Sequence, residues 1–276
     1  PDELEKIVEF KDASEEERQI RLCNSGIMAF NGARMGELLG MLQNDNESKE
    51  YYLTDCVEHA RSKGWTARLK VTDESDVMGI NTRHELAIAE QIVQNRLRQR
   101  ALEAGVTLKD PNTVFLCQDT ALAADVTVEP NVVFGPGVSV ATGATLRAFS
   151  HLEDCTIQED AVVGPYARIR PGTTVGSGAC VGNFVEVKNT NVGENAKINH
   201  LSYVGDATVG AEANIGAGTI TCNYDGFQKS QTEIGIGAFI GSNSALVAPV
   251  TIGDGAIIGA GSTVTKDVAD NALAVT

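Results

Sequence analysis

The residues of this chain that are best suited to acid–base and hydrogen-bonding chemistry gather in one segment, Val181 to Gly226. The candidate residues in that segment are Lys188, His200, Tyr203, Asn214, Asn223 and Tyr224. An unperturbed imidazole titrates at about pH 6.5, so His200 is the natural candidate for a group that takes up a proton near neutral pH. A histidine that is merely exposed is the alternative interpretation.

Two basic residues close to this segment have a spacing that would bring them together. Arg170 and Lys188 each follow an aliphatic residue and are 18 positions apart. In a coil of three six-residue units they lie on the same face of adjacent coils, about one strand spacing apart, roughly 4.8 Å. Two like charges so close favour an anion between them, and a sugar phosphate would supply one. The alternative is a pair of solvated side chains.

The element that positions these residues is a repeat with a period of six. Aliphatic residues return at every sixth position, with one-residue slips and one interruption over CNYDGFQKSQTE. The series contains Val126, Val132, Val138, Ala144, Ile157, Val163, Ile169, Val175, Val181, Val187, Val192, Ile198, Val204, Val209, Ile215, Ile234, Ile240, Leu246, Ile252, Ile258 and Val264. One short strand and one corner use six residues, so three units close a triangular coil. Stacked coils form a parallel β solenoid, for which the general crossover rule favours a right hand.

Residues 1–105 show a different pattern, in which strand and helix signals alternate. IVEF, GIMAF and WTARLKV resemble short buried strands, and Asn31 can cap a helix over GARMGELLGML. Thr82 and Glu85 have the spacing of a capping box before a long helix over about 82–104. Three strands and three helices make an incomplete sheet, which predicts the C-terminal part of a larger α/β domain. The second domain then spans 106–276.

Composition excludes some classes of partner. A formal net charge of −15 argues against general affinity for nucleic acid or anionic membrane. No apolar run approaches the roughly 20 residues needed to cross a bilayer. The six cysteines show no metal-type spacing, which favours reduced thiols and a cytoplasmic protein. The N-terminus PDELEKIVEF has no signal-peptide pattern and no Met, which suggests a piece of a longer chain.

Longer strings carry a family resemblance. The repeat is similar to the hexapeptide family of left-handed parallel β-helix acyltransferases, and that resemblance implies a left-handed coil. ARIRPG, VGNFVEVKN, INHLSYVGD and NIGAGTITCNYDG resemble the acetyltransferase domain of the bifunctional GlmU family, which joins an N-acetylglucosamine-1-phosphate uridyltransferase to a glucosamine-1-phosphate N-acetyltransferase. IVEFKDA, NSG and GINTRHEL resemble the end of its uridyltransferase domain. The expected fold is mainly β: a left-handed parallel β-helix preceded by an incomplete α/β nucleotidyltransferase-like segment and a long linking helix.

The resemblance implies a role for each matching residue. His200 would be the general base that deprotonates the amine of glucosamine 1-phosphate as it attacks the thioester of acetyl-CoA, and Glu186 would orient the imidazole. The substrate would be bound by Arg170, Lys188, Tyr203 and Asn214. Acetyl-CoA would be bound by Ala217, Asn223, Tyr224, Ser242 and Ala260. We expect His200, Arg170 and Lys188 to share one outer wall of the coil.

The resemblance extends to assembly and to the first region. It implies a homotrimer whose active sites are shared between chains, working in UDP-N-acetylglucosamine biosynthesis for the bacterial cell envelope, and a short basic tail beyond NALAVT that contributes to the acetyl-CoA pocket. Glu9, Asn24 and Asn81 match uridyltransferase positions, and Asn81 matches a Mg²⁺ ligand. One amide cannot hold Mg²⁺, which needs several oxygen ligands, so uridylyl transfer is expected only from the full-length enzyme.

Two other functions fit the same fold class. A solenoid that only trimerises a sugar nucleotidyltransferase predicts no outward His, Lys and Arg constellation. A metal-dependent carbonic anhydrase needs three histidine ligands, whereas the repeat offers only His151 and His200. Acetyl transfer is therefore the favoured prediction.

Overall fold

The computed structural model describes residues 3–46 and 48–276 and divides into two compact units, Pro1–Ile92 and Val93–Thr276. The division falls inside a long helix, α3 (Arg83–Glu103), and thus before the predicted domain boundary at 105. The two units are described separately.

Short helices make up the regular structure of the first unit. The sequence correctly predicts the caps of two of them, α1 (Gly32–Leu39) and α3, whereas α2 (Cys56–Ser62) begins without a side-chain cap. The Asn31 side chain accepts a hydrogen bond from the Ala33 backbone N–H at 3.0 Å, as predicted for a cap. At the start of α3, Thr82 Oγ1 accepts from the Glu85 N–H at 3.2 Å and Glu85 Oε2 accepts from the Thr82 N–H at 2.7 Å, so the capping box is confirmed. The helices of this unit besides α3 are η1 (Glu17–Gln19), α1 (Gly32–Leu39), η2 (Leu53–Asp55), α2 (Cys56–Ser62) and η3 (Glu74–Asp76).

The three strands predicted in residues 1–105 are not formed. In the described part of the first unit, extended backbone pairs only at an isolated antiparallel bridge between Glu3 and Arg68. A short apolar run becomes a strand only where a neighbouring strand satisfies its backbone, and IVEF and GIMAF have no such neighbour here. The nucleotidyltransferase-like character of this region stays a prediction.

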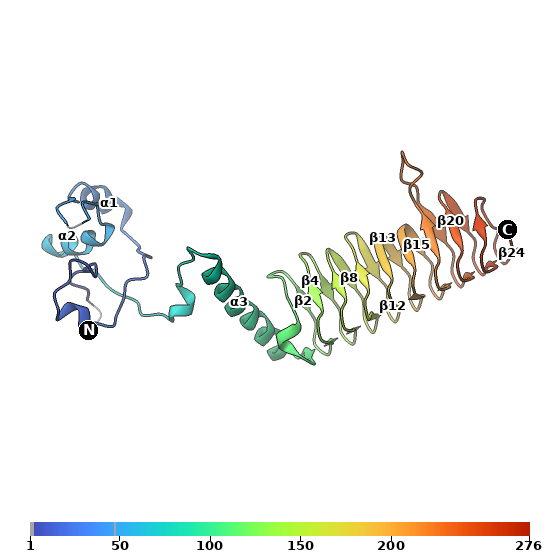
Figure 1. The fold of residues 1–276 in the computed structure, drawn as a ribbon, viewed down its shortest axis with the longest axis horizontal. Coiled ribbons are helices and arrows are strands. Elements are labelled where there is room, and N and C mark those ends of the chain that lie inside the picture. Colours follow the sequence, from blue (N-terminus) through green and yellow to red (C-terminus); the bar gives the residue numbers. More distant parts are fainter. Residues whose placement is uncertain (1–2, 47) are drawn as a thin grey trace. The chain divides into compact units, whose positions relative to one another are not determined.

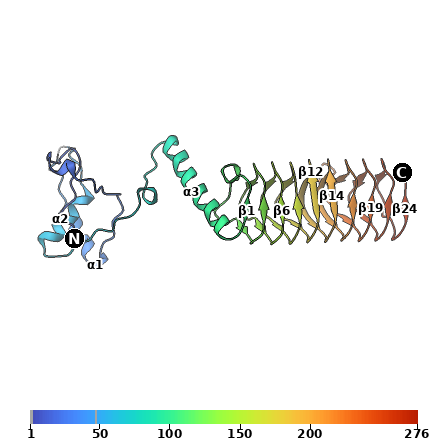
Figure 2. The same ribbon diagram turned by 90° about the horizontal axis from the view of Figure 1, so that it is seen from below.

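The second unit is a solenoid of stacked parallel coils, each with three short strands that form three flat walls (Figure 1). The first wall, seen face-on in Figure 2, contains ten strands. They are β1 (Thr107–Leu108), β3 (Thr127–Val128), β6 (Thr145–Leu146), β9 (Val162–Val163), β12 (Cys180–Asn183), β14 (Lys197–His200), β16 (Asn214–Ile215), β19 (Phe239–Ile240), β22 (Ile257–Ile258) and β24 (Leu273–Ala274).

The other two walls are joined, because two seven-residue strands, β13 (Glu186–Val192) and β15 (Tyr203–Val209), run through the corner between them. The second wall also contains β4 (Val133–Phe134), β7 (His151–Leu152), β10 (Arg168–Ile169), β17 (Ile220–Cys222), β20 (Ala245–Val247) and β23 (Thr263–Val264). The third wall also contains β2 (Ala121–Leu122), β5 (Ser139–Val140), β8 (Cys155–Ile157), β11 (Thr173–Val175), β18 (Thr232–Ile234) and β21 (Val250–Ile252). A short helix, η4 (Pro111–Thr113), lies in the first coil.

The strand register reproduces the sequence period and its slips. Thr127 pairs with Thr145, 18 residues on, whereas Lys197 pairs with Asn214, 17 residues on. Asn214 pairs with Phe239 across the predicted interruption, which forms a loop. The parallel solenoid is therefore confirmed. The left hand stays a prediction of the resemblance, since pairing register does not define the hand of a coil.

Most strands bury two residues, counting the residue just before the strand, rather than the one that the period of six indicates; β2 and β24 are exceptions and bury none. On the first wall Ala196 and Ile198 point inward on either side of Lys197, and both are fully buried. The first inward residue is usually small, which allows a tight turn at the corner. The second is usually a large aliphatic residue, which fills the core. At several coils the small residue is Ser or Thr and its hydroxyl donates to a corner carbonyl, as Ser244 does to Gly241 at 2.7 Å, whereas the buried hydroxyls of Thr173 and Thr232 have no partner in the described structure.

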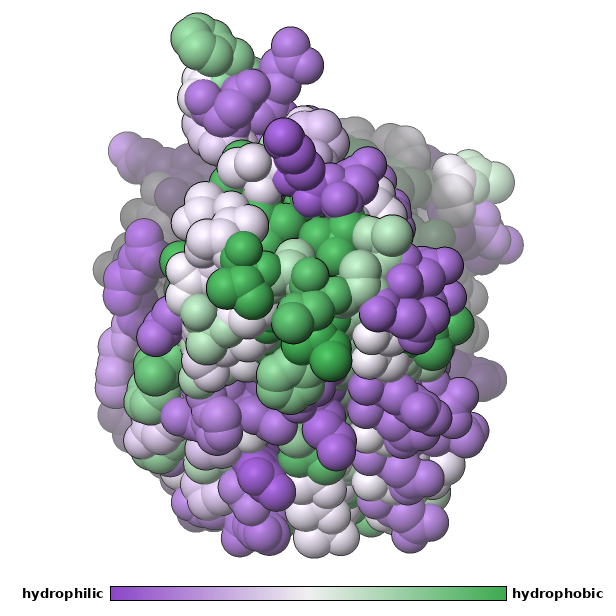
Figure 3. All heavy atoms as spheres, turned by 90° about the vertical axis from the view of Figure 1, so that its right-hand side faces the viewer, coloured by the Kyte–Doolittle hydropathy of each residue, from purple (hydrophilic) through white to green (hydrophobic). Residues whose placement is uncertain are grey.

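The two ends of the solenoid differ. At the first coil, α3 covers the core: Gln94 exchanges two hydrogen bonds with the Leu116 backbone, and the Arg98 Nε donates to the Val114 carbonyl at 2.8 Å. At the last coil, hydrophobic side chains gather in the centre of the exposed end (Figure 3), where Leu273 and Val275 are exposed. No helix in the described part of the chain is long and apolar enough to cross a membrane.

Candidate functional site

A row of residues runs along the solenoid where the first wall ends. Successive coils place equivalent residues above one another at this edge, and we name them the His200 row: Asn183, His200, Ala217, Ser242 and Ala260. The row brings together His200 and three of the positions predicted to bind acetyl-CoA. Reasoning from the sequence missed Asn183, which the strand register places next to His200.

Backbone hydrogen bonds at the neighbouring corner hold the row in register. The carbonyls of Asn183, His200, Ala217 and Ser242 each accept from an N–H of the next coil at 2.8–3.2 Å. Beyond His200 the row continues with three small residues, Ala217, Ser242 and Ala260, so the row itself carries no long side chain on those coils. Stacked parallel strands are about 4.8 Å apart, so these residues follow the imidazole at that spacing.

The imidazole of His200 has a defined partner. Its Nδ1 lies 2.8 Å from Asn183 Oδ1. An amide oxygen only accepts hydrogen bonds, so in the neutral ring this contact leaves the proton on Nδ1 and the lone pair on Nε2. The Ser202 hydroxyl donates to the His200 carbonyl at 2.8 Å and fixes the corner that follows. A neutral ring held in this tautomer can accept a proton at Nε2.

Glu186 does not contact His200, contrary to the role expected for it. It lies on the second wall, where its carboxylate bonds Arg170 Nη1 at 2.8 Å and lies 3.7 Å from Arg168 Nη1. The partner that orients the imidazole is Asn183. Glu186 instead supplies the negative charge between two guanidinium groups, and so it sets the position of Arg170.

Arg170 and Lys188 lie on adjacent coils, as the 18-residue spacing predicts. The pairs Arg168 with Glu186 and Ile169 with Val187 set this register, and the Arg170 N–H donates to the Val187 carbonyl at 2.8 Å. Lys188 makes no ion pair with any part of the chain that the structure describes. Its ammonium group is therefore available to an external anion.

The expectation that His200, Arg170 and Lys188 share one wall is wrong. His200 belongs to β14 of the first wall, whereas Arg170 and Lys188 belong to the second wall. The corner at Leu201, with a φ of 51°, separates them. Tyr203 and Asn214 are divided in the same way: Tyr203 pairs with Glu186 on the second wall, and Asn214 pairs with Lys197 on the first.

A buried carboxylate lies at the next corner, between the second and third walls. Asp206 Oδ1 accepts from Asn189 Nδ2 at 2.7 Å and its Oδ2 accepts from Asn223 Nδ2 at 2.5 Å. Burial alone would raise the pKa of Asp206, but the two amide donors and the charges of Lys188 and Lys229 outweigh it and lower the pKa. Reasoning from the sequence missed this residue, although its spacing of 17 from both asparagines is a signal that could have found it.

The interrupted part of the repeat forms a loop between β17 and β18, which projects from the solenoid in Figure 1. Asn223, at its base, is buried and lies 3.5 Å from the Tyr203 hydroxyl. Tyr224 is exposed, its hydroxyl donates to the Gly226 carbonyl at 2.6 Å, and its backbone bridges to Lys229. The two residues predicted to act together thus differ: Asn223 belongs to the wall, and Tyr224 to a projecting arm.

The positions matched to the uridyltransferase do not form a metal site. Glu9 is exposed, Asn24 closes a turn with the Gly26 N–H at 3.2 Å, and the Asn81 N–H donates to Glu85. Within residues 3–46 and 48–276 no three His, Cys, Asp or Glu side chains are placed to hold a metal ion. These residues do not fit Mg²⁺, which needs several oxygen ligands around one point.

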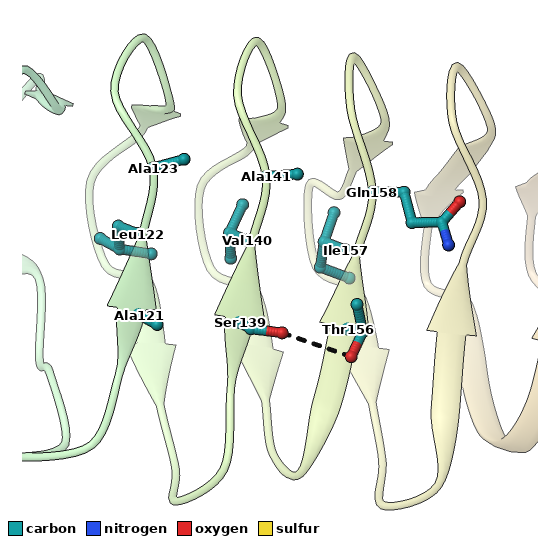
Figure 4. Close-up of a pocket in the computed structure, with 9 residues that line it drawn as sticks. All are labelled: Ala121, Leu122, Ala123, Ser139, Val140, Ala141, Thr156, Ile157 and Gln158. Atoms are coloured by element: carbon teal, nitrogen blue, oxygen red, sulfur yellow. Dashed lines mark hydrogen bonds between the residues drawn. The ribbon is translucent and has the colours of Figure 1, made fainter.

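Two open hollows of the solenoid lie away from the His200 row. One, of about 430 Å³, runs along the third wall over β2, β5 and β8, where Ser139 and Thr156 share a hydrogen bond (Figure 4). Another, of about 460 Å³, is lined by Gly178, Asn195, Lys197 and Glu212. Neither hollow is lined by His200, Arg170 or Lys188.

Known proteins match this chain along almost all of its length. The bacterial transferase hexapeptide family (six repeats) matches residues 154–189 and 231–266. The bifunctional protein GlmU of Paramagnetospirillum magneticum is 54% identical over 272 residues, and that of Bradyrhizobium diazoefficiens is 60% identical over 274 residues; each match covers 99% of this chain and 61% of the relative.

Solved structures resemble the chain more distantly. LpxA from Acinetobacter baumannii is 15% identical, with a TM-score of 0.44 over 62% of this chain and 71% of that one, a likeness too low to support an argument about function. The sequence matches are far closer. Along nearly its whole length this chain is a homologue of the bifunctional GlmU proteins, with bacterial transferase hexapeptide repeats, and it spans about three-fifths of their length.

Proposed function

We propose that the chain transfers the acetyl group of acetyl-CoA to the amine of glucosamine 1-phosphate, giving N-acetylglucosamine 1-phosphate and CoA. The observation that carries the proposal is the His200 row: an imidazole whose Nδ1 bonds Asn183, followed on the next coils by three small residues. The homology to bifunctional GlmU proteins supports it.

In this reaction His200 Nε2 takes a proton from the sugar amine as the amine nitrogen attacks the thioester carbonyl carbon. The tetrahedral intermediate then collapses, the carbon–sulfur bond breaks, and CoA leaves as its thiolate. The developing imidazolium is stabilised because its Nδ1–H still donates to Asn183 Oδ1. No covalent enzyme intermediate is needed.

Substrate binding uses the second wall. Lys188, with no ion pair of its own in the described structure, and Arg170, held by Glu186, would bind the phosphate. Tyr203 and Asn214 would bind the sugar. Acetyl-CoA would lie along Ala217, Ser242 and Ala260, with Asn223 and Tyr224 as further contacts. Acetyl-CoA supplies the activated acyl group, and these residues hold it against the attacking amine.

A second copy of the chain would complete the site. The proposed groups lie on two walls of one chain, and the Tyr224 arm projects from the solenoid. We propose a homotrimer in which the arm of one chain reaches the site of the next. Co-expression of His200→Ala with Tyr224→Ala chains tests this, since random assembly gives about a quarter of the sites both intact groups. If the mixed protein is no more active than the two variants, the arm serves its own chain.

A thiol-reagent assay for released CoA, with glucosamine 1-phosphate as acceptor, tests the activity itself. His200→Ala should lower kcat by roughly 10²–10⁴-fold, because the proton acceptor is lost. His151→Ala is the matched control, an exposed histidine on the second wall, and should be unchanged. Asn183→Ala should lower kcat about tenfold, the cost of one oriented hydrogen bond. Equal CoA release by wild type and His200→Ala would refute the assignment.

The alternative, a solenoid that only trimerises a nucleotidyltransferase, predicts no acceptor-dependent release of CoA by any of these proteins. The cytoplasmic location expected for this biosynthetic step is part of the same proposal.

A further inference from the structure

Three polar residues form a column at the corner between the second and third walls. Asn189, Asp206 and Asn223 follow one another at 17-residue intervals, so each lies one coil beyond the last. The two amides donate to opposite oxygens of the central carboxylate. Asp206 thereby ties three successive coils together through side chains alone.

Asp206 is unusual among the corner aspartates because its side chain is buried. Its relative exposure is 7%, whereas Asp154, at the same corner and also at a positive φ, is exposed. A buried charge is costly unless hydrogen bonds and opposite charges compensate for it. Here Asn189 and Asn223 provide the bonds, and Lys188 and Lys229 provide the charge. A turn by itself requires none of these groups, since Asp154 turns the chain without them.

The column lies directly behind groups that the proposed reaction uses. Asn223 Nδ2, which donates to Asp206, is 3.5 Å from the Tyr203 hydroxyl. The Tyr203 ring lies over Gly205, where an added Cβ would come within 2.3 Å of its oxygen, so Tyr203 has little room to move away from Asn223. The Asn223 carbonyl also accepts from the Ser230 N–H at 2.9 Å, which closes the base of the loop.

We infer that Asp206 is a positioning residue for the proposed acetyl transfer: its carboxylate fixes the Asn223 amide, and through it the Tyr203 hydroxyl and the base of the loop that carries Tyr224 and Lys229. The inference rests on the proposed function for its kinetic consequence. Asp206 itself does not contact the substrate. Its carboxylate holds groups of the second wall and the loop, whereas the His200 row lies on the first wall.

Asp206→Asn and Asp154→Asn make a matched pair, because both keep a side chain that tolerates positive φ. In Asp206→Asn one oxygen becomes an amide nitrogen that faces a donor. We expect KM for glucosamine 1-phosphate and for acetyl-CoA to rise about tenfold, with kcat within about twofold. Asp154→Asn should match the wild type. A variant that merely loses folded protein would lower apparent kcat at unchanged KM, and that result would overturn the inference.

Limited proteolysis tests the same inference without any activity. Lys229 lies in the loop, and trypsin cleaves after lysine. Asp206→Asn should be cut after Lys229 several times faster than wild type or Asp154→Asn, because the loop base has lost its anchor. Equal cleavage rates in the three proteins would refute the positioning role. If the wild type proves to have no transferase activity, the proposed function fails, while this measurement still decides whether Asp206 holds the loop.

Asn223→Ala provides a second route should Asp206→Asn fold poorly. It removes the group through which Asp206 is proposed to act, so it should also raise both KM values and speed cleavage after Lys229. In the double variant Asp206→Asn/Asn223→Ala the effects should not add. Additive effects would mean that Asp206 and Asn223 act independently.

Discussion

The two units of this chain bury their apolar residues in different ways. In the described part of the first unit only Leu38, Cys56 and Val57 are buried hydrophobic residues. In the solenoid the buried residues form one continuous cluster from Val106 to Val264, with most side chains fully buried. The first unit has isolated apolar runs such as IVEF and GIMAF, whereas the solenoid repeats one apolar position every six residues. In a repeat, each apolar residue packs against the equivalent residue of the next coil. An apolar run that is not repeated needs another segment of the chain to pack against.

This contrast predicts that the same type of substitution will have very different effects in the two units. The unfolding of the two units can be followed separately in one experiment. Its one tryptophan, Trp65, lies in the first unit, where Arg34 stacks on it, so fluorescence reports that unit. Far-UV circular dichroism is dominated by the strands of the solenoid.

Glycine-to-alanine replacement should give the largest difference. At Gly182 an added Cβ would lie 2.1 Å from the Asn199 carbonyl oxygen, so adjacent coils must separate and the solenoid should be destabilised by more than about 4 kcal/mol. At Gly36, inside α1, nothing lies within 4 Å, and alanine should stabilise the helix by roughly 0.5–1 kcal/mol. Thermal unfolding followed by both signals measures this. A Gly182→Ala protein as stable as wild type would contradict the tight coil stacking.

Leucine-to-alanine replacement should give an intermediate difference. Leu246 is fully buried in the solenoid, and its truncation should cost about 3 kcal/mol in urea unfolding followed by circular dichroism. Leu38→Ala should shift only the Trp65 transition and leave the solenoid transition in place. If Leu38→Ala shifts both transitions equally, the two units unfold as one and the comparison fails.

Acidification should give the smallest difference. The lowered pKa of Asp206 means that its ionised form stabilises the folded solenoid; this contribution is present above the ordinary value of 3.8 and is lost as pH falls through the folded pKa below it. The Tm difference between wild type and Asp206→Asn should therefore be constant near neutrality and vanish in strong acid.

Glu85 is a carboxylate outside the solenoid whose pKa is also lowered, so it serves as the comparison for Asp206. Backbone hydrogen bonds from Asn81 and Thr82 lower its pKa, so the sign of its effect is the same. Because Glu85 is exposed, Glu85→Gln should change Tm less than Asp206→Asn at neutral pH. A larger effect of Glu85→Gln would contradict the view that burial makes the Asp206 charge matter.

Local signals in the sequence predicted local features correctly. Asn31, Thr82 and Glu85 cap their helices because a cap depends on residues within one turn. The period of six predicted the parallel solenoid because it repeats one local geometry many times. The strands expected from IVEF, GIMAF and WTARLKV failed because a strand depends on a neighbour that the local sequence does not contain.

The sequence by itself predicted one inward residue for each six-residue unit and the placement of Arg170 and Lys188 on adjacent coils, since both follow from counting in sixes; the second inward residue of most strands came only from the structure. Only the tertiary structure decided that His200 lies on a different wall from those cations, that Asn183 rather than Glu186 holds its ring, and that Asp206 is buried behind Asn223. The physical reason is that a sequence period gives only the spacing of residues along the chain. Which side chains meet across a corner or between coils depends on where the chain bends, and each one-residue slip shifts that position.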